Sequence, residues 1–553
     1  MNNGVDILLM TNNFGYKSYM EPAGISILAG ILKHDGFTTC VLEPAVWAWD
    51  VQQCIAYVNE QRPKILALSI LIDANMKQIN ELIDGVKEKN PDTVVIAGGQ
   101  AITMNYREEK YEDFYRKTEF FMVGESESTI SSLVNCLLRG EDWKTINGIV
   151  YKENGEIIVN PPAKPVMDLD EIPMMDRTVL GELLKQNGDY RETSVQYGRG
   201  CRHACSFCSI GQLFKTKDST HCLRRRSLDK VYEEIEYLFY EYGIRRFNIE
   251  DESFLETGED EKKAIIRFCQ RIKKLPEKVA LMFLGRIDCV DEEVCKELLE
   301  AGTSYMFLGI DSAVDEDLKL FNKGYTKETV YKNMKMLMDL GYSADVDSEH
   351  RVAVGYITWH PYTTRKGLRE SLQFCLDFHN TPKLLQHKLF LFGTTPLKKK
   401  IENDGLMVDS KLDEESFEFN WRFQNEGIQE LCDCVMTYFD EWSPFRDGIR
   451  TLEKYVMIEK PEAKKFLENL VLKRKDMDKQ FLEFFEVLLE ASEDGKDNSI
   501  YQQITENYIR KIGNVLTEQE LQQIDAFCKK YEFEGNVIED LKSGIGILMR
   551  YRN

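Results

Sequence analysis

The sequence predicts an α/β protein in three parts: a Rossmann-like doubly wound domain, a partial (β/α)6 TIM barrel and a helical C-terminal domain. Short apolar runs alternate with amphipathic stretches over the first 150 residues, and the alternation resumes after a proline-rich segment. Long helical patterns follow from about Lys398. Strands that alternate with helices are typical of parallel sheets covered by helices. A chain of 553 residues also exceeds the length at which a single core stops growing.

The first domain, which we place at residues 1–145, contains five apolar runs that are each followed by a helical pattern. The expected strands are 5–10, 37–42, 64–70, 93–97 and 119–123. Between Gly24 and Gly36 the apolar residues fall on one helical stripe, and Gly36 ends the pattern. These features predict a doubly wound parallel sheet.

A hairpin and a linker are expected at residues 146–190. Asn154 and Gly155 suit the positive φ values of a tight two-residue turn between two apolar runs. The proline-rich stretch at 160–176 then indicates a domain boundary.

The second domain is placed at residues 191–395 and the helical domain at 396–553. Strands are expected at 193–198, 245–250, 278–285, 304–310, 350–358 and 383–392, and a helical pattern follows each except the last. Six repeats are too few for a closed eight-stranded barrel and predict an open one. In the helical domain, Phe481, Phe484, Phe485 and Leu488 recur at helical spacing, which favours a packed core in a helical cap. Cys432 and Cys434 are expected either in that core or as reactive thiols.

Composition narrows the functional classes. With 43% hydrophobic and 30% charged residues and no run of about 18 apolar residues, the chain is expected to be a soluble protein without a membrane span. The first residues show no basic region or cleavage site, so we expect no targeting segment and a cytoplasmic location. The net charge of −22 disfavours a nucleic-acid substrate. The basic run at 224–226 is expected to be a solvated loop, with a helix beginning at Ser227.

Cysteine usage points to one metal site. The chain has 14 cysteines without a disulfide framework, which predicts reduced thiols, and only Cys201, Cys205 and Cys208 form a tight cluster. They follow the first expected strand of the second domain, at the C-terminal mouth where barrels place their active sites. Three thiolates can hold three irons of a [4Fe-4S] cluster and leave the fourth iron for an external ligand. A zinc knuckle is the alternative, but neither His203 nor Cys222 completes a ligand pair of the usual spacing.

The spacing Cys-x3-Cys-x2-Cys, with the aromatic Phe207 before the last cysteine, resembles the signature of the radical S-adenosylmethionine (SAM) superfamily. This resemblance implies that SAM chelates the open iron and that an electron from the cluster releases a 5'-deoxyadenosyl radical. It also implies a low-potential electron donor such as flavodoxin or ferredoxin.

Further segments resemble SAM contacts of the same superfamily. The acidic strand end with Glu250, Asp251 and Glu252 matches the place where the superfamily holds the SAM amino group. Arg286 would pair with the SAM carboxylate, for which a planar guanidinium is suited. Asp311, which replaces the usual glutamate, would reach the ribose hydroxyls together with Ser312.

The first domain resembles the cobalamin-binding domain that accompanies many radical SAM barrels, so that the resemblance covers about residues 4–395. It rests on the helix beginning near Gly24, on the strand end with Gly98 and Gly99, and on the loop with Gly124, Glu125 and Glu127. The loop after Ser69 is expected to face the corrin or to be a packed strand end.

The cobalt-ligating motif Asp-x-His-x-x-Gly of cobalamin mutases is absent, because His34 is the only histidine of the domain and lies in "LKHDGF". Its absence is compatible with bound cobalamin and with a domain that has lost it.

Together these features predict a cobalamin-dependent radical SAM methyltransferase that transfers a methyl group from methylcobalamin to a carbon of a natural-product or peptide substrate. The expected cofactors are a [4Fe-4S] cluster, SAM and cobalamin. His350, His360 and Tyr362, around the fifth strand, are expected either to line the cavity or to be satisfied core residues.

Three alternatives remain open. One is an enzyme of the same architecture that catalyses rearrangement or cyclisation, with or without cobalamin. Another is a methylthiotransferase with a second cluster at Cys40, Cys54 and Cys136. The third is a non-catalytic corrinoid or metal-binding module.

Overall fold

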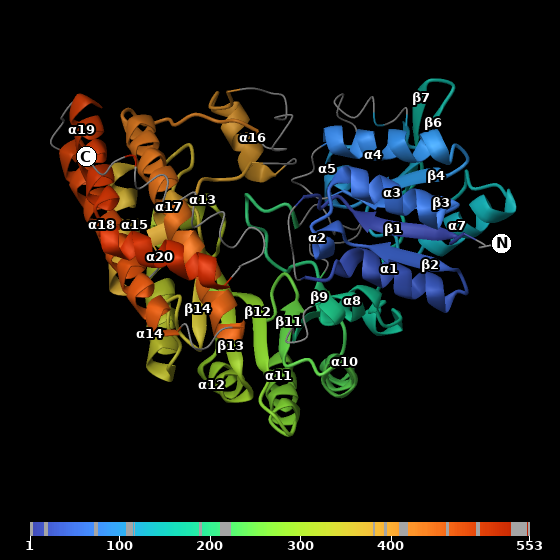
Figure 1. Cartoon of the computed structure of the whole chain (residues 1–553), viewed down its shortest axis with the longest axis horizontal. Helices are drawn as coiled ribbons and strands as arrows, with labels where there is room; N and C mark the ends of the chain where they lie inside the picture. The colour runs from blue at the N-terminus through green and yellow to red at the C-terminus, as the bar shows by residue number, and fades with distance from the viewer. Residues whose placement is uncertain are drawn as a thin grey trace.

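The computed structural model describes residues 4–15, 20–70, 76–106, 114, 117–186, 191–210, 223–379, 382–391, 395–408, 419–459, 464–493, 498–531 and 550. Figure 1 shows an N-terminal α/β lobe at the right, a second sheet in the centre and the C-terminal helices at the left. The predicted fold class is confirmed: two α/β units are followed by helices.

The first sheet has the strand order β2-β1-β3-β4-β5-β6-β7. Its strands are β1 Ile7–Thr11, β2 Thr39–Leu42, β3 Ile65–Ser69, β4 Val94–Gly98, β5 Phe120–Met122, β6 Ile149–Glu153 and β7 Glu156–Val159. The first five pair in parallel, as the five apolar runs predict. The last two form the predicted hairpin, in which Asn154 and Gly155 have φ values of 51° and 88°. The hairpin extends the first sheet instead of belonging to the linker.

Helices cover both faces of this sheet. They are α1 Ala23–His34, α2 Pro44–Trp47, α3 Val51–Gln61, α4 Met76–Lys89, α5 Gln100–Asn105 and α7 Ile130–Arg139. Successive residues of β1 enter different cores: Ile7 and Leu9 pack with α1 and α7, whereas Leu8 and Met10 pack with α3 and α4. This period of two, with apolar residues on both faces, is the reason for the continuous apolar runs of the sequence.

The second sheet is parallel throughout its described part, with the order β14-β13-β12-β11-β8. Its strands are β8 Glu192–Gln196, β11 Arg246–Glu250, β12 Ala280–Arg286, β13 Thr303–Asp311 and β14 Arg351–Tyr356. The helices that follow them are α10 Leu228–Glu241, α11 Glu259–Ile272, α12 Glu292–Ala301, α13 Asp315–Leu320, α14 Lys327–Leu340 and α15 Arg365–Asp377. The short strands β9 Gly198–Arg199 and β10 Arg224–Arg225 pair antiparallel beside β8.

The sixth predicted strand, 383–392, is reduced in the structure. Pro382–Gln386 forms the 3-10 helix η4, and Lys388 pairs with Trp359 in a single isolated bridge. Backbone hydrogen bonds from Thr358 and Trp359 to the His387 carbonyl, both 3.0 Å, keep the segment beside the sheet. The 3-10 turn takes up the first half of the apolar run, so too few residues remain in register for a strand.

The C-terminal region is helical, with α16 Pro396–Asn403, α17 Ile428–Glu459, α18 Lys464–Glu493, α19 Asn498–Gly513 and α20 Glu518–Tyr531. The predicted core residues Phe481, Phe484, Phe485 and Leu488 are buried, and Cys432 is buried in the same core. The long helices pack against α15 and η4, beside the edge of the second sheet, rather than as a cap over the mouth (Figure 1). Among the described helices, none is both long and apolar enough to cross a membrane.

Candidate active site

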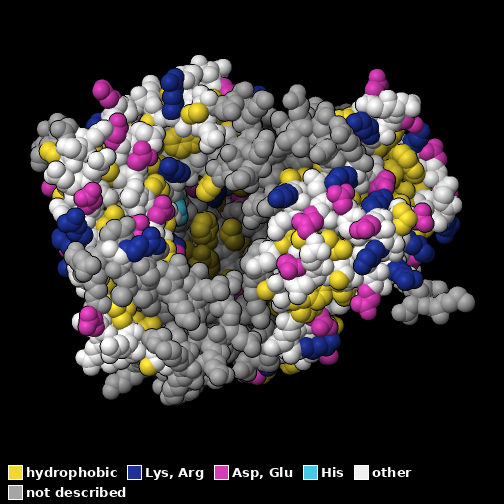
Figure 2. All heavy atoms as spheres, turned by 45° about the horizontal axis from the view of Figure 1, so that its top comes forward, with side chains coloured by type: hydrophobic (Ala, Val, Ile, Leu, Met, Phe, Trp, Pro, Cys, Tyr) yellow, Lys and Arg dark blue, Asp and Glu magenta, His cyan; other side chains and the backbone are white. Residues whose placement is uncertain are grey.

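A cavity of about 460 Å³ lies between the two sheets, at the C-terminal ends of their strands. One wall comes from the ends of β3, β4 and β5 and from α1, and the other from the ends of β8 and β11. Figure 2 shows the hollow between the two lobes, with hydrophobic side chains on its floor. Because open α/β sheets and barrels both bind ligands at the carboxyl ends of their strands, the two edges meet at one shared site.

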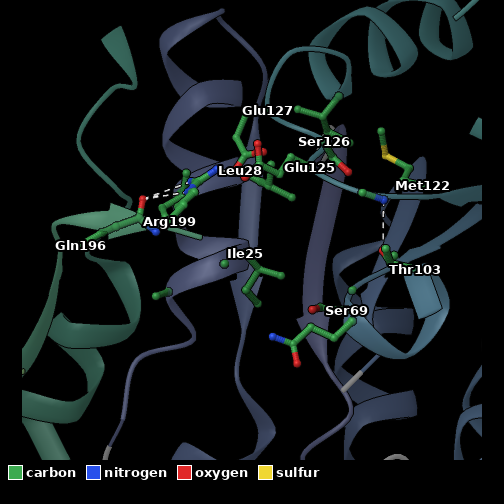
Figure 3. Close-up of a pocket in the computed structure, with 18 of the residues that line it drawn as sticks. Ile25, Leu28, Ser69, Thr103, Met122, Glu125, Ser126, Glu127, Gln196 and Arg199 are labelled. Atoms are coloured by element: carbon green, nitrogen blue, oxygen red, sulfur yellow. Dashed lines mark hydrogen bonds and ion pairs between the residues drawn. The ribbon is translucent and has the colours of Figure 1, made fainter. Parts of the chain in front are cut away.

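The residues that the sequence associates with cobalamin converge on this cavity. Its wall includes Ser69, Gly98, Gly99, Gly124, Glu125 and Glu127. Figure 3 shows Ser69 and Thr103 on one side and Glu125, Glu127 and Arg199 on the other.

Gly99 is required by the backbone. Its φ of 99° is unfavourable for other residues, and a Cβ atom there would lie 2.5 Å from the carbonyl oxygen of Ile70. Gly124, with a φ of 83°, has open space at its Cβ position and donates its N–H to Thr103 Oγ1 at 3.1 Å. The two glycines therefore let backbone, not side chains, form the cavity wall.

Glu125 and Glu127 make ion pairs with the second unit. Glu127 lies 2.6 Å from Arg199 Nη1, and Arg224 Nη1 donates to Glu125 Oε2 at 2.8 Å. All four side chains are at most 13% exposed. The carboxylates thus join the first lobe to β9 and β10, and their predicted contact with a cofactor stays a prediction.

The prediction that the basic run at 224–226 is a solvated loop is wrong. Arg224 is 5% exposed, Arg225 donates to the Ser253 carbonyl at 2.6 Å, and Arg226 contacts Glu234 at 2.5 Å. Each guanidinium finds a buried acceptor on another element, which a charge run in sequence does not reveal. The helix boundary is confirmed, because Ser227 Oγ accepts the Lys230 N–H and caps α10.

The loop that carries Cys201, Cys205 and Cys208 follows β9 and is held by residues 320–322. Ser206 donates its N–H to the Phe321 carbonyl at 2.9 Å and its hydroxyl to the Leu320 carbonyl at 2.7 Å. Helix α16 reaches the same loop, because Leu397 N–H donates to the Ser206 carbonyl at 2.8 Å. Phe207 packs edge-on against Phe321, with ring centroids 5.3 Å apart, so the structure places it as an anchor of the loop.

The three thiols are half-buried free cysteines. Burial raises the pKa of Cys201 and raises that of Cys208 to about 11, and the neighbouring thiols act in the same direction. Arg286 Nη1 lies 3.2 Å from Cys205 Sγ and brings a positive charge to the loop. A metal that binds here must displace thiol protons.

The zinc-knuckle alternative is disfavoured by the positions of the sulfur atoms. Among the described residues, the three sulfur atoms do not meet within 4.8 Å of one another, as the ligands of one mononuclear ion would. Ligands to three different irons of a cluster need no such common point. Cys222 lies outside the described residues.

The acidic strand end also lines the cavity, through Glu250, Asp251 and Glu252. Asp251 is 8% exposed and its Oδ1 accepts the Ser253 N–H at 2.9 Å. Its Oδ2 has no hydrogen bond among the described residues, and Arg225 Nε is 3.8 Å away. Burial, opposed by Arg225, raises the pKa of Asp251 to about 7, and burial also raises the pKa values of Glu250 and Glu252. This site suits a cationic group.

Arg286 is already paired with protein groups. Its Nε and Nη2 contact the two carboxylate oxygens of Asp288 at 3.0 and 3.1 Å, and Nη2 donates to the Lys323 carbonyl at 2.7 Å. Although burial opposes the charge, Asp288 holds the pKa of Arg286 above its usual value. The expected contact with a SAM carboxylate stays a prediction.

Asp311 and Ser312 contact other protein groups. Asp311, at a φ of 63°, forms an ion pair with Lys323. Ser312 is fully buried, donates to Asp317 at 3.0 Å and accepts the Val314 N–H at 3.1 Å. The Ser312 hydroxyl is thus used at the start of α13, and the expected ribose contact of the two residues stays a prediction.

The polar residues around the fifth strand contact other protein groups. His350, before β14 and so at the end of the strand away from the mouth, contacts the Thr303 carbonyl at 2.6 Å. His360 is 1% exposed and lies 3.1 Å from Asp317, and Tyr362 donates to Asp404 at 2.7 Å. None of the three residues lines the described cavity, and His360 Nε2 makes no hydrogen bond among the described residues.

Cys40, Cys54 and Cys136 do not form a second metal site. Cys40 lies 3.4 Å from the Tyr57 hydroxyl, Cys136 contacts the Asp142 carbonyl at 3.7 Å, and Cys54 is buried between α3 and the sheet. Among the described residues these three sulfur atoms form no common metal-binding group.

Sequence reasoning missed Arg199, Gln196 and Asn248, which also line the cavity. Nothing in the spacing of these three polar residues marks them as site residues. The one signal for Arg199 in the sequence is its position two residues before Cys201.

Comparisons with known proteins agree with this architecture. Residues 13–134 match the B12 binding domain, and residues 195–374 match the radical SAM superfamily. An uncharacterized methyltransferase of Pyrococcus horikoshii is 29% identical over 256 residues, which are 45% of this chain and 51% of the relative. An anaerobic magnesium-protoporphyrin IX monomethyl ester cyclase of Rubrivivax gelatinosus is 26% identical over 58% of this chain and 57% of its own length. The chain thus spans little more than half the length of these relatives.

A solved structure shares the fold over almost the entire chain. The cobalamin-dependent S-adenosylmethionine radical enzyme OxsB, determined with aqua-cobalamin and S-adenosylmethionine bound, superposes with a TM-score of 0.77 at 17% identity. The match covers 99% of this chain and 84% of OxsB. The two domain matches and the shared fold identify the chain as a radical SAM protein with an N-terminal B12-binding domain.

Proposed function

We propose that this protein is a cobalamin-dependent radical SAM methyltransferase that acts at a carbon of a natural-product or peptide substrate. The observation that carries the proposal is the cavity whose two walls are the strand ends of the B12-binding and radical SAM domains. A site enclosed by both domains suits a reaction that needs both cofactors. The similarity to a methyltransferase supports methyl transfer.

The residues present fit the proposed cofactors. Three free thiols without a disulfide, Cys201, Cys205 and Cys208, would hold a [4Fe-4S] cluster. The unpartnered Asp251 Oδ2 and its acidic neighbours would hold the amino group of SAM. Gly98, Gly99 and Gly124 would border cobalamin. When bound, these groups supply a 5'-deoxyadenosyl radical and a transferable methyl group.

The chain itself would contribute a positive charge beside the cluster ligands and an apolar lining that excludes water from the cavity. Arg286 places a cation 3.2 Å from the Cys205 sulfur, beside the proposed cluster ligands. Apolar side chains of Ile25, Leu28 and Leu284 line the cavity and limit the entry of water. A radical reaction depends on this control, because a misplaced substrate exposes the protein to attack.

The described part of the chain offers no imidazole at the cavity wall. His34 ends α1 with its side chain 72% exposed and lies 3.3 Å from Asp35. The described residues that line the cavity include no histidine. We therefore propose that cobalamin binds without a histidine ligand, which favours the passing on of a methyl group.

A second candidate function is a cyclisation or rearrangement by the same cofactors, with or without cobalamin. The similarity to an anaerobic cyclase favours it. The second cluster of the methylthiotransferase alternative finds no common ligand group at Cys40, Cys54 and Cys136 among the described residues. A low-potential donor such as flavodoxin or ferredoxin would reduce the cluster, and a cytoplasmic location stays a prediction.

The test is an anaerobic assay of the cluster-reconstituted, cobalamin-loaded chain with methyl-labelled SAM, a low-potential reductant and candidate extracts. Methylation predicts both 5'-deoxyadenosine and a labelled product. Formation of 5'-deoxyadenosine with a converted but unlabelled substrate would support cyclisation instead. A non-catalytic module would give neither product.

Two variants control the assay. Cys205→Ala removes a proposed cluster ligand and should abolish 5'-deoxyadenosine formation. Cys295→Ala, in the buried core of α12, should leave it intact.

A further inference from the structure

A mixed group of potential metal ligands lies beside the cysteine loop, apart from the proposed cluster ligands. The imidazole of His203, the carboxylate of Glu256 and the thiol of Cys289 each offer one ligand atom, and these atoms lie within 4.8 Å of one another. The Cys289 sulfur is 3.8 Å from His203 Nε2. Among the described residues, no other three such side chains converge in this way.

Each ligand comes from a different element. His203 lies within the loop, between Cys201 and Cys205, and its backbone N–H donates to the Cys201 sulfur at 3.5 Å. Glu256 lies between β11 and α11, and Cys289 ends the 3-10 helix η3, Ile287–Cys289, that follows β12. All three positions are at the C-terminal mouth of the second sheet.

The burial of Glu256 is a separate observation that points to a ligand. Its side chain is 2% exposed, yet its Oε1 has no hydrogen-bond partner among the described residues. Arg225 Nη2 is 3.9 Å away, and that guanidinium is already used by the Ser253 carbonyl at 2.6 Å and by Glu261 at 3.1 Å. An unpaired buried carboxylate oxygen is costly, and a cation bound to it removes that cost.

The donor set selects the class of metal. An imidazole nitrogen, a carboxylate oxygen and a thiolate sulfur together suit Zn²⁺, whereas Mg²⁺ and Ca²⁺ prefer oxygen donors alone. Three protein ligands leave a fourth tetrahedral position for water or another ligand. On binding, a zinc–sulfur bond forms and the thiol proton of Cys289 leaves to solvent.

We propose that His203, Glu256 and Cys289 form a mononuclear zinc site that fastens the cysteine loop to the ends of β11 and β12. The site is separate from Cys201, Cys205 and Cys208 and does not depend on the proposed methyl transfer. Its contribution is to hold the loop, because His203 is part of the loop while the other two ligands belong to the barrel.

The first test uses the full-length, cluster-reconstituted wild-type protein. Elemental analysis should find one zinc per chain in addition to the cluster iron. X-ray absorption at the zinc edge should show one sulfur at about 2.3 Å and lighter ligands at about 2.0–2.2 Å. Zinc with three or four sulfur ligands, a fifth iron in its place, or no zinc at stoichiometric level would each overturn the proposal.

The second test uses three variants. Cys289→Ala and His203→Ala should each lower zinc retention by about tenfold or more, since loss of a direct ligand exceeds the 10–100-fold effect of outer partners. Both should keep the cluster iron. Cys295→Ala, another buried cysteine after β12, should keep both metals. Because His203 is only partly buried, His203→Ala remains informative if Cys289→Ala does not fold.

Zinc that persists in both ligand variants would contradict the site. Both readouts are metal contents and need no substrate. A protein that binds this zinc but transfers no methyl group would therefore refute only the proposed function.

Discussion

At the scale of single residues, the site is built from charges held out of water. Asp251 shows this most clearly, since one carboxylate oxygen is hydrogen-bonded to Ser253 N–H while the other is buried without a hydrogen bond among the described residues. The nearby Arg225 compensates only in part, so burial still raises the pKa of Asp251 to about 7. Such an environment costs stability unless a ligand supplies the missing partner.

The raised pKa of Asp251 predicts a pH dependence of folding stability. The native chain holds the Asp251 proton more tightly than the unfolded chain, so its contribution is full below about pH 4 and is lost as the pH rises through about 7. Asp251→Asn keeps the acceptor for Ser253 but cannot ionise. Urea unfolding of cofactor-free protein should therefore show the variant gaining stability relative to wild type between about pH 4 and 7. A difference that stays constant with pH would contradict this expectation.

At the scale of elements, the strand ends decide where the cavity lies. β3 and β4 end at Ser69 and Gly98, and both residues line the cavity. The turn after β4 depends on Gly99, whose Cβ position faces the Ile70 carbonyl. A side chain at this position would push two neighbouring strand ends apart.

Gly99→Ala should destabilise the first domain by about 1–3 kcal/mol through backbone strain, with a further loss from the contact to Ile70. Gly24→Ala is the matched control, because it lies in α1 with no atom within 4 Å of its Cβ position. Its expected effect is neutral or slightly stabilising. Urea unfolding curves of the two variants measure the difference, and equal stability of Gly99→Ala and wild type would contradict the assigned role.

The sequence predicts these elements well, because alternation and helical spacing record burial directly. All five strands of the first parallel sheet lie where apolar runs predict them, and the turn at Asn154 and Gly155 has the expected positive φ values. The shortened sixth strand is the exception, because an apolar run does not reveal a 3-10 turn at Pro382.

Contacts between distant elements could not be predicted. The sequence shows Ser312, but it does not reveal that the Ser312 hydroxyl is buried and donates to Asp317. It also shows the basic run at 224–226, but it does not reveal that Arg224 contacts Glu125, which lies 99 residues earlier. The short motif of Cys201, Cys205 and Cys208 was recognisable because a cluster ligand set is local in sequence.

At the scale of the whole molecule, buried ion pairs join the two α/β units. Arg177, in the connecting segment, contacts Glu21 of the first unit at 2.7 Å and Glu234 on α10 at 2.6 Å. All three side chains are at most 4% exposed. Together with the Arg199–Glu127 pair at the cavity, these ion pairs hold the strand ends of the two sheets next to each other.

Arg177→Ala should lower the free energy of unfolding by about 3–5 kcal/mol, because it leaves Glu21 buried without its cation. Lys185→Ala breaks an exposed pair with Glu182 and should change it by less than about 1 kcal/mol. Thermal and urea unfolding of both variants give the comparison. Equal effects of the two substitutions would mean that Arg177 does not join the domains energetically.

The central claim is that one cavity between the two domains serves both a reduced iron–sulfur cluster on Cys201, Cys205 and Cys208 and a cobalamin. Electron paramagnetic resonance of the anaerobic, reconstituted chain with cob(II)alamin bound tests it without a substrate. Two paramagnetic centres in one site should broaden or split each other's signals when the cluster is reduced, and Cys205→Ala should remove the effect. A spectrum that is the plain sum of an unperturbed cluster and an unperturbed cob(II)alamin, or a chain that binds neither, would contradict the claim.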